Sequence, residues 1–94
     1  MKIVSREQIL QFIEKHSDAK GAIESWWQET IEANWREPKD IKERYRTVSF
    51  LGGNIVIFNI KGNNYRLVVK IAYQQKTVLI KWIGTHAEYD KQQF

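Results

Sequence analysis

The clearest pattern of secondary structure in the sequence is Tyr65-Arg66-Leu67-Val68-Val69-Lys70-Ile71-Ala72-Tyr73, where apolar and polar residues follow a two-residue period. Successive side chains of a strand point to opposite faces of its sheet, so this period predicts a β-strand with one buried face. The expected core face carries five large side chains, namely Tyr65, Leu67, Val69, Ile71 and Tyr73. The other face, left free for function, would carry Arg66, Val68, Lys70 and Ala72.

Three further segments around this run share its period. They are Arg46–Leu51, Asn54–Ile60 and Thr77–Ile83, and the turns between the four strands fall at 52–53, 62–63 and 74–76. Connections this short join antiparallel neighbours. The chain from Arg46 onward therefore predicts an antiparallel meander.

The residues before Arg46 show helical spacing instead. The predicted elements are, in order, a short strand at Lys2–Val4 and helices over Arg6–His16, Asp18 to about Trp35, and Pro38–Arg44. Ser5 is expected to cap the first helix, with Gln8 completing a capping box, and Asp18 to cap the second. Pro38 suits the first turn of the third helix, although a simple turn at Glu37-Pro38 would also fit.

Helices followed by a meander predict an α+β domain that spans residues 1–94. The N-terminal helices would pack on one face of a mainly antiparallel sheet of four to five strands. A last helical turn is expected over Glu88–Gln92. Trp26, Trp27 and Trp35 are expected to pack in the core, and Trp82 is expected to share a core-facing side with Val78 and Ile80.

The amino-acid composition limits the kinds of metal or cofactor site that the protein can form. The 94 residues include no cysteine and only two histidines, so neither a thiolate metal site nor another resident metal or cofactor is expected. His16 is interpreted as a helix-end residue without a functional role. No apolar run approaches the ~20 residues of a membrane span, and the N-terminus becomes polar too early for a signal peptide, so a cytoplasmic location is expected.

The positive charge is concentrated in the second half of the chain. Residues 1–47 hold nine basic and nine acidic residues, whereas residues 48–94 hold six basic and two acidic, which accounts for the whole net charge of +4. A basic face suits a polyanion such as nucleic acid or an acidic protein. A solvated, lysine-rich surface is the alternative interpretation.

Two cations on the free face of the central strand fit an extended nucleic acid. Arg66 and Lys70 lie four residues apart, which is ~13 Å at a strand rise of ~3.3 Å per residue. That spacing suits successive phosphates of an extended RNA strand better than one phosphate. Lys61 and Asn63 sit in the turn before this strand, and Lys61 is expected to reach the same groove as Arg66. The alternative interpretation is that these residues lie on a solvent-exposed face of the sheet and have no functional role.

The C-terminal run Lys81-Trp82-Ile83-Gly84-Thr85-His86-Ala87-Glu88-Tyr89-Asp90-Lys91 gathers polar groups just beyond the break at Gly84. Histidine is the side chain whose ordinary pKa suits proton transfer near neutral pH, so His86 is a candidate for that role; Thr85 offers a polar group to a ligand, and Tyr89 suits proton donation or base stacking. The alternative makes His86 an ordinary helix residue and Tyr89 a packing residue at the sheet edge.

The runs Gly62–Tyr73 and Lys81–Lys91, in this order and spacing, resemble the HigB toxins of the RelE-like group. The resemblance covers roughly Glu29 to Lys91. It implies a RelE-like fold and a metal-independent endoribonuclease that cleaves mRNA, on the ribosome, and is silenced by a cognate antitoxin of helix-turn-helix type.

The resemblance also implies roles for individual residues. Arg66 corresponds to the strand arginine of the RelE-like pattern, and Tyr89 to its C-terminal tyrosine. The second arginine of that pattern is absent here, and His86 is expected to replace it. The expected catalytic residues are Arg66, His86 and Tyr89, and the expected RNA-binding residues are Lys61, Asn63, Lys70 and Thr85.

A non-catalytic module that binds single-stranded nucleic acid is the alternative function. It would use the same basic face and would stack bases on exposed rings. The strand aromatics mostly fall with the apolar set, however, which leaves few rings for such a platform; they are Phe50, Phe58, Tyr65 and Tyr73. A protein-interaction domain for an acidic partner is contained in the toxin hypothesis, because the antitoxin needs such a surface.

Overall fold

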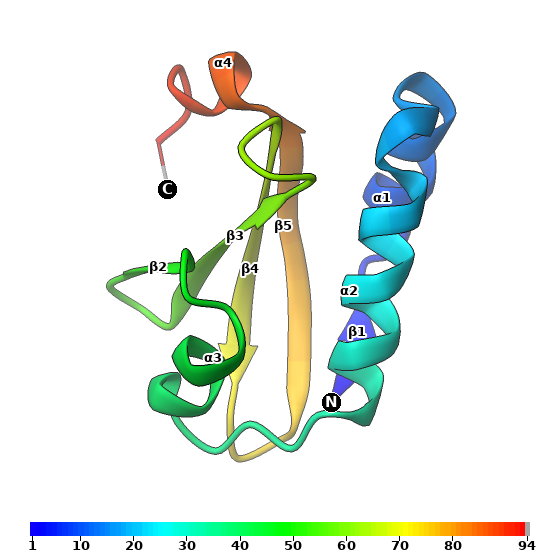
Figure 1. Ribbon diagram of the computed structural model, residues 1–94. Coiled ribbons are helices and arrows are strands. Elements are labelled where there is room, and N and C mark those ends of the chain that lie inside the picture. Colours follow the sequence, from blue (N-terminus) through cyan, green and yellow to red (C-terminus); the bar gives the residue numbers. More distant parts are fainter. Residues whose placement is uncertain (94) are drawn as a thin grey trace.

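A five-stranded mixed sheet organises the computed structural model, which describes residues 1–93 (Figure 1). The strands are β1 Lys2–Val4, β2 Ser49–Leu51, β3 Ile55–Ile60, β4 Tyr65–Ala72 and β5 Thr77–Thr85. Their spatial order is β1-β5-β4-β3-β2. The pair β1–β5 is parallel, and the other three pairs are antiparallel. The expected meander and the α+β class are thereby confirmed.

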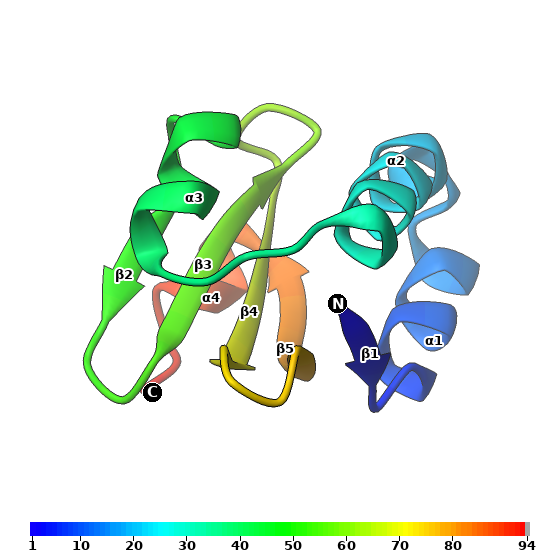
Figure 2. The ribbon, with the colours of Figure 1, turned by 90° about the horizontal axis from the view of Figure 1, so that it is seen from below.

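The helical elements lie mostly before the meander. They are α1 Glu7–Lys15, the 3₁₀ turn η1 Ser17–Ala19, α2 Lys20–Glu32, α3 Pro38–Arg44 and the short α4 His86–Tyr89. In Figure 2, α2, α3 and the segment that joins them lie on one side of the sheet, and the C-terminal end lies on the other. We call the side that faces α2 and α3 the inner face and the opposite side the outer face.

The core lies between the inner face and the helices. Alternate residues of the strands, including Phe58, Leu67 and Ile71, are buried against Ile9, Phe12, Ile23, Trp26 and Ile41. Phe58 is the centre of an aromatic cluster: its ring stacks on Trp35 at 6.0 Å and meets Tyr45 edge-on at 5.1 Å. The packing role expected of Trp26 and Trp35 is confirmed, because both are buried, and Trp27 packs partly buried against the core.

A β-bulge changes the orientation of the last strand. Val68 pairs with Trp82, but the next residue, Val69, pairs with Ile80, so Lys81 is the extra residue of β5. A bulged residue reverses the alternation beyond it. Trp82 therefore lies on the outer face with Val68, and the expectation that it shares a face with Val78 and Ile80 was wrong.

Two of the expected helix caps were also wrong. Ser5 adopts a positive φ of 68°, and Arg6, which takes the N-cap position of α1, makes no side-chain cap hydrogen bond. Asp18 lies inside η1 and binds side chains of the sheet instead of capping α2, which ends at Glu32 rather than near Trp35. Among the described residues, no helix combines the length and the apolar character needed to cross a membrane.

Candidate active site

The outer face brings Arg66 into one row with Asn59 and Gly84. In the strand register, Arg66 of β4 lies opposite Asn59 of β3 and Gly84 of β5. The next row holds Ile57, Val68 and Trp82. Gly84 has no side chain, and the Trp82 ring occupies the space that a side chain at this position would need. A methyl group built on Gly84 would lie 2.5 Å from two Trp82 ring carbons.

The Arg66 guanidinium is held against an aromatic ring. Its central carbon lies 5.9 Å from the centre of the Tyr89 ring, within the range of a cation–π contact. Its Nη1 is buried, yet has no hydrogen-bond partner within residues 1–93. A buried charged donor without a partner is unfavourable. An anionic oxygen, such as that of a phosphate, is the kind of acceptor that would satisfy this N–H group.

The short helix α4 positions Tyr89 and His86, and a capping box at its start explains why it forms. The Thr85 hydroxyl accepts the Glu88 backbone N–H at 3.1 Å, and the Glu88 carboxylate accepts the Thr85 backbone N–H at 2.8 Å. The second of these bonds holds the pKa of the Glu88 carboxyl below its usual value. The His86 backbone N–H also donates to the Asn64 carbonyl at 3.2 Å, which joins α4 to the β3–β4 turn.

The His86 side chain is half-exposed and lies close to a carboxylate. Its Nδ1 is 3.6 Å from the Asp90 carboxylate, one helical turn further along the chain. A carboxylate at this distance can orient the imidazole ring. Tyr89, which follows His86 by three residues, contacts both Arg66 and Trp82, with its ring 6.1 Å from that of Trp82. The structure thus brings Arg66 and Tyr89 into contact, with His86 on the same short helix as Tyr89.

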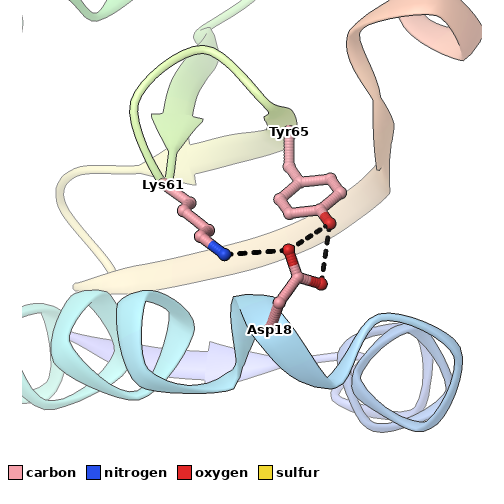
Figure 3. Close-up of polar contacts among 3 residues, drawn as sticks. All are labelled: Asp18, Lys61 and Tyr65. Atoms are coloured by element: carbon pink, nitrogen blue, oxygen red, sulfur yellow. Dashed lines mark hydrogen bonds and ion pairs between the residues drawn. The ribbon is translucent and has the colours of Figure 1, made fainter.

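The Lys61 side chain points away from Arg66. Its ammonium binds the Asp18 carboxylate of η1 at 3.0 Å, and the Tyr65 hydroxyl donates to the same carboxylate at 2.7 and 2.8 Å (Figure 3). These contacts, first the Tyr65 hydroxyl and then Lys61, hold the pKa of Asp18 below its usual value. Tyr65 belongs to the inner face, so Lys61 points toward the helical layer, and the structure does not bring it to Arg66.

The other three expected RNA-binding residues take different positions. Lys70 is exposed on the outer face, opposite Ile55 and Leu79, and a buried Val68 separates it from Arg66 along the strand. Asn63 is exposed in the β3–β4 turn. Thr85 is the capping residue of α4, and its hydroxyl is occupied there.

Sequence reasoning missed two residues near this site, Asn59 and Asp90, and assigned Trp82 to the wrong face of the sheet. Asn59 could have been found, because strand alternation places it opposite the buried Phe58 and Ile60. Asp90 follows His86 at helical spacing, which is also visible in the sequence. Trp82 could not be found in this way, since its position depends on the bulge. Within residues 1–93, no three His, Asp or Glu side chains gather in a way that could hold a metal ion.

Comparison with known proteins identifies the family of the chain. Residues 19–92 match the family model of HigB toxins, described as the RelE-like toxic component of a toxin–antitoxin system. The chain is also 26% identical over 93 residues to a protein named mRNA interferase HigB from Escherichia coli O6:H1 (strain CFT073), and the match covers 97% of this chain and 90% of that protein. Since the family model covers most of the sequence, the chain belongs to the HigB family of RelE-like toxins.

Proposed function

We propose that this toxin is an endoribonuclease that cleaves mRNA by attack of a ribose 2′-hydroxyl, without a metal ion. The observation that carries the proposal is the buried Arg66 Nη1, which has no partner in residues 1–93 and lies against Tyr89 on the outer face. A phosphodiester oxygen is the ligand that would satisfy it. The name of the Escherichia coli relative, an mRNA interferase, supports RNA as the substrate.

The reaction needs three groups. The 2′-oxygen attacks the neighbouring phosphorus and its proton passes to a base, while the bond from phosphorus to the 5′-oxygen breaks and an acid protonates the leaving oxygen. A cation stabilises the charge that accumulates on the phosphorane between these steps. The products are a 2′,3′-cyclic phosphate, which hydrolysis opens to a 3′-phosphate, and a 5′-hydroxyl.

We assign Arg66 to the phosphorane and His86 to proton transfer, with the Asp90 carboxylate 3.6 Å from the His86 Nδ1 to orient the ring. Tyr89 serves as the second proton-transfer group or as a stacking surface for a base. We assign Lys70 to a phosphate further along an extended strand and Asn63, in the β3–β4 turn, to a further RNA contact. Thr85 acts through α4, because its hydroxyl is engaged in the capping box. Lys61 is the weakest of the expected RNA ligands, because Asp18 occupies its ammonium.

The cellular setting belongs to the same proposal. A toxin of a toxin–antitoxin system has an antitoxin partner. We propose that this antitoxin is a helix-turn-helix protein, that the toxin acts in the cytoplasm, and that it cleaves mRNA in the decoding site of the ribosome. Ribosome dependence is measured by comparing cleavage of the same mRNA free in solution and bound to ribosomes.

Chelation and a modified substrate test the mechanism. Purified protein is incubated with ribosome-bound mRNA and with free RNA after EDTA treatment of the protein and the RNA, with free Mg²⁺ restored only where ribosomes require it. If the protein cleaves free RNA, that cleavage should continue in EDTA and give products with a 5′-hydroxyl. Replacing the 2′-hydroxyl at the mapped cleavage position by 2′-O-methyl should abolish cleavage there. Cleavage of the 2′-O-methyl substrate would show that water attacks, and RNA binding without cleavage of either substrate would favour the non-catalytic module.

A further inference from the structure

A polar groove runs along the edge of the sheet beside the candidate active site. β1 pairs only with Thr77–Leu79, so within residues 1–93 no strand covers the rest of β5 on this side, and α1 runs along it. We call the space between them the α1–β5 groove; its polar lining is Gln8, Gln11, Lys15, His16 and Glu88, and Trp82 borders it. The Gln8 amide lies at one end, where it donates to the Ile80 carbonyl at 3.4 Å.

The side chains of this groove have the chemistry of nucleobase recognition. Carboxamides such as Gln8 and Gln11 present a donor and an acceptor together, which is the pattern that base edges require. Both are exposed, and the Gln11 amide makes no hydrogen bond within residues 1–93. Aromatic rings such as Trp82 offer a stacking surface for unpaired bases of any identity. Gln8, Gln11 and Trp82 line the same groove, so a base bound there would meet both carboxamides and an aromatic ring.

The charges at the groove also fit a nucleotide. Lys15 is an exposed cation on the last turn of α1, and His16 follows it with its ring stacked on Phe12 at 4.5 Å. Glu88 is the one carboxylate of the lining, and its Oε1 is engaged by the Thr85 backbone N–H. The Thr85 backbone N–H chiefly, and then the charges of His16 and Lys15, hold the pKa of Glu88 below its usual value, so the Lys15 ammonium lies near this carboxylate and would be shared between it and a phosphate.

Trp82 connects this groove with the candidate active site. Its ring covers Gly84 and lies 6.1 Å from the Tyr89 ring, which in turn lies 5.9 Å from the Arg66 guanidinium carbon. Glu88 likewise belongs to α4 and to the groove. A single strand whose phosphate is bound at Arg66 would therefore meet the groove on passing Tyr89 and Trp82.

We propose that the α1–β5 groove binds a base of single-stranded RNA next to the cleaved phosphodiester, with Gln8 and Gln11 on the base edge and Lys15 on a phosphate. This inference rests on the proposed function, because it extends the RNA path away from Arg66. It makes the groove a source of cleavage-site preference, separate from the groups that perform the reaction.

Binding is tested first, with a short single-stranded RNA that carries 2′-O-methyl at every position and therefore cannot be cleaved. The side-chain amide signals of Gln8 and Gln11 are followed by NMR during titration, with Gln28 of α2, whose amide is hydrogen-bonded to Glu32, as the internal control. Shifts confined to Gln8 and Gln11 are expected. Saturable RNA binding that leaves both signals unmoved would overturn the inference, whether or not the protein cleaves RNA.

Variants then test the role in cleavage. Gln11→Ala is expected to alter the pattern of cut sites and to reduce discrimination between preferred and disfavoured sites by about 5- to 100-fold, the range of a good base contact. Lys15→Ala should weaken RNA binding and reduce the slope of log affinity against log salt by about 0.7. Lys20→Ala, an exposed lysine on α2, is the matched control and should match the wild type.

The outcomes separate the two proposals. A wild type that binds RNA through Gln8 and Gln11 but never cleaves would refute the proposed function and keep the groove. Cleavage with an unchanged site pattern in both Gln11→Ala and Lys15→Ala would refute the groove and keep the proposed function. Variants that lose antitoxin binding while RNA affinity and site pattern stay at wild-type values would assign the groove to the protein partner, and the inference would fail.

Discussion

Gly84 shows how one absent side chain shapes the outer face. A methyl group at this position would lie 2.5 Å from Cζ2 and Cη2 of Trp82 and 2.9 Å from the Glu88 Oε1. Gly84→Ala is therefore expected to displace the Trp82 ring and to lower the free energy of unfolding by about 1–3 kcal/mol, the usual cost of overpacking. Thermal or urea unfolding measures this change.

The matched control is Gly21→Ala in the first turn of α2, where nothing lies within 4 Å of an added methyl group. That substitution should leave the free energy of unfolding unchanged or raise it by less than about 1 kcal/mol, because a first-turn position gains only part of the higher helix propensity of alanine. If Gly84→Ala is as stable as the wild type, the Trp82 ring does not lie over Gly84.

Arg66 allows the most direct test of the active site. Arg66→Ala should reduce RNA cleavage by about 10²–10³-fold, the typical loss when one donor to transition-state charge is removed. The fold should survive, because the Arg66 side chain is not part of the inner-face core. Cleavage is measured under single-turnover conditions, beside a circular dichroism spectrum.

Lys70→Ala, on the same face of the same strand, is the matched control. It should weaken RNA binding modestly and leave the rate of the bound complex unchanged. Arg66→Ala activity within a few-fold of the wild type would remove Arg66 from the reaction.

Asp18 gives the protein a defined sensitivity to acid. The Tyr65 hydroxyl and Lys61 hold its folded-state pKa below the ordinary value of 3.8. A carboxyl with a lowered folded pKa contributes stability above its unfolded pKa, and that contribution is lost as the pH falls through the folded value. The difference in melting temperature between wild type and Asp18→Asn should therefore be present near neutral pH and should shrink as the pH falls below the ordinary value of 3.8. A difference that does not shrink below that pH would contradict the assignment.

The sequence predicted the positions of side chains that local contacts fix, and it did not predict those fixed by contacts between residues far apart in the chain. Arg66 follows from the alternation of a single strand, so its free face was predictable. Lys61 is placed by Asp18, 43 residues away, and no local pattern reports such a contact. Trp82 depends on one extra residue, Lys81, whose insertion is fixed by pairing with β4.

At the scale of elements, α4 is the part of the site with the least structure to support it. It has four residues, none of them buried, and depends on the capping box between Thr85 and Glu88 and on the bond from His86 to the Asn64 carbonyl. Isolated helices of this length are unstable in water. The position of Tyr89 and His86 is thus controlled by capping rather than by packing.

Thr85→Val tests this dependence, since it keeps a β-branched side chain at the end of β5 and removes the capping hydroxyl. Loss of an N-cap costs about 0.5–2 kcal/mol of helix stability, so α4 should fray while the sheet stays folded. RNA cleavage should fall several-fold with little change in melting temperature. Thr85→Ser restores the hydroxyl and should restore most of the activity; equal activity in the Val and Ser variants would show that the cap does not position the site.

The elements themselves were more predictable than their ends and caps. Pro38–Arg44 was predicted with the observed bounds, because proline at the first position fixes the start of a helix. The predicted caps at Ser5 and Asp18 were wrong because a side chain that suits a helix cap can also form other hydrogen bonds. The Asp18 carboxylate, for example, binds the Tyr65 and Lys61 side chains. The real capping box, Thr85 with Glu88, has the same sequence signature and was overlooked.

For the whole molecule, the fold separates a neutral half from a basic half. Residues 1–47, which supply β1 and the helices of the inner side, carry nine basic and nine acidic residues, and the meander with its C-terminal helix carries the net +4. A positive sheet region attracts a polyanion and speeds its association. The same charge would attract an acidic antitoxin, so one surface can serve substrate and inhibitor.

Expression in growing bacteria tests the toxin as a whole. The wild-type chain alone should arrest growth, because a member of this family is the toxic component of a toxin–antitoxin system. Arg66→Ala at equal protein level should permit growth, which separates catalysis from a non-specific burden of folded protein. Co-expression of the small helix-turn-helix protein expected from a neighbouring gene should relieve the arrest by wild type and should co-purify with both forms. Arrest by Arg66→Ala as strong as that by the wild type would mean that toxicity comes from binding rather than from RNA cleavage. Normal growth with folded wild-type protein present would contradict the toxin function itself.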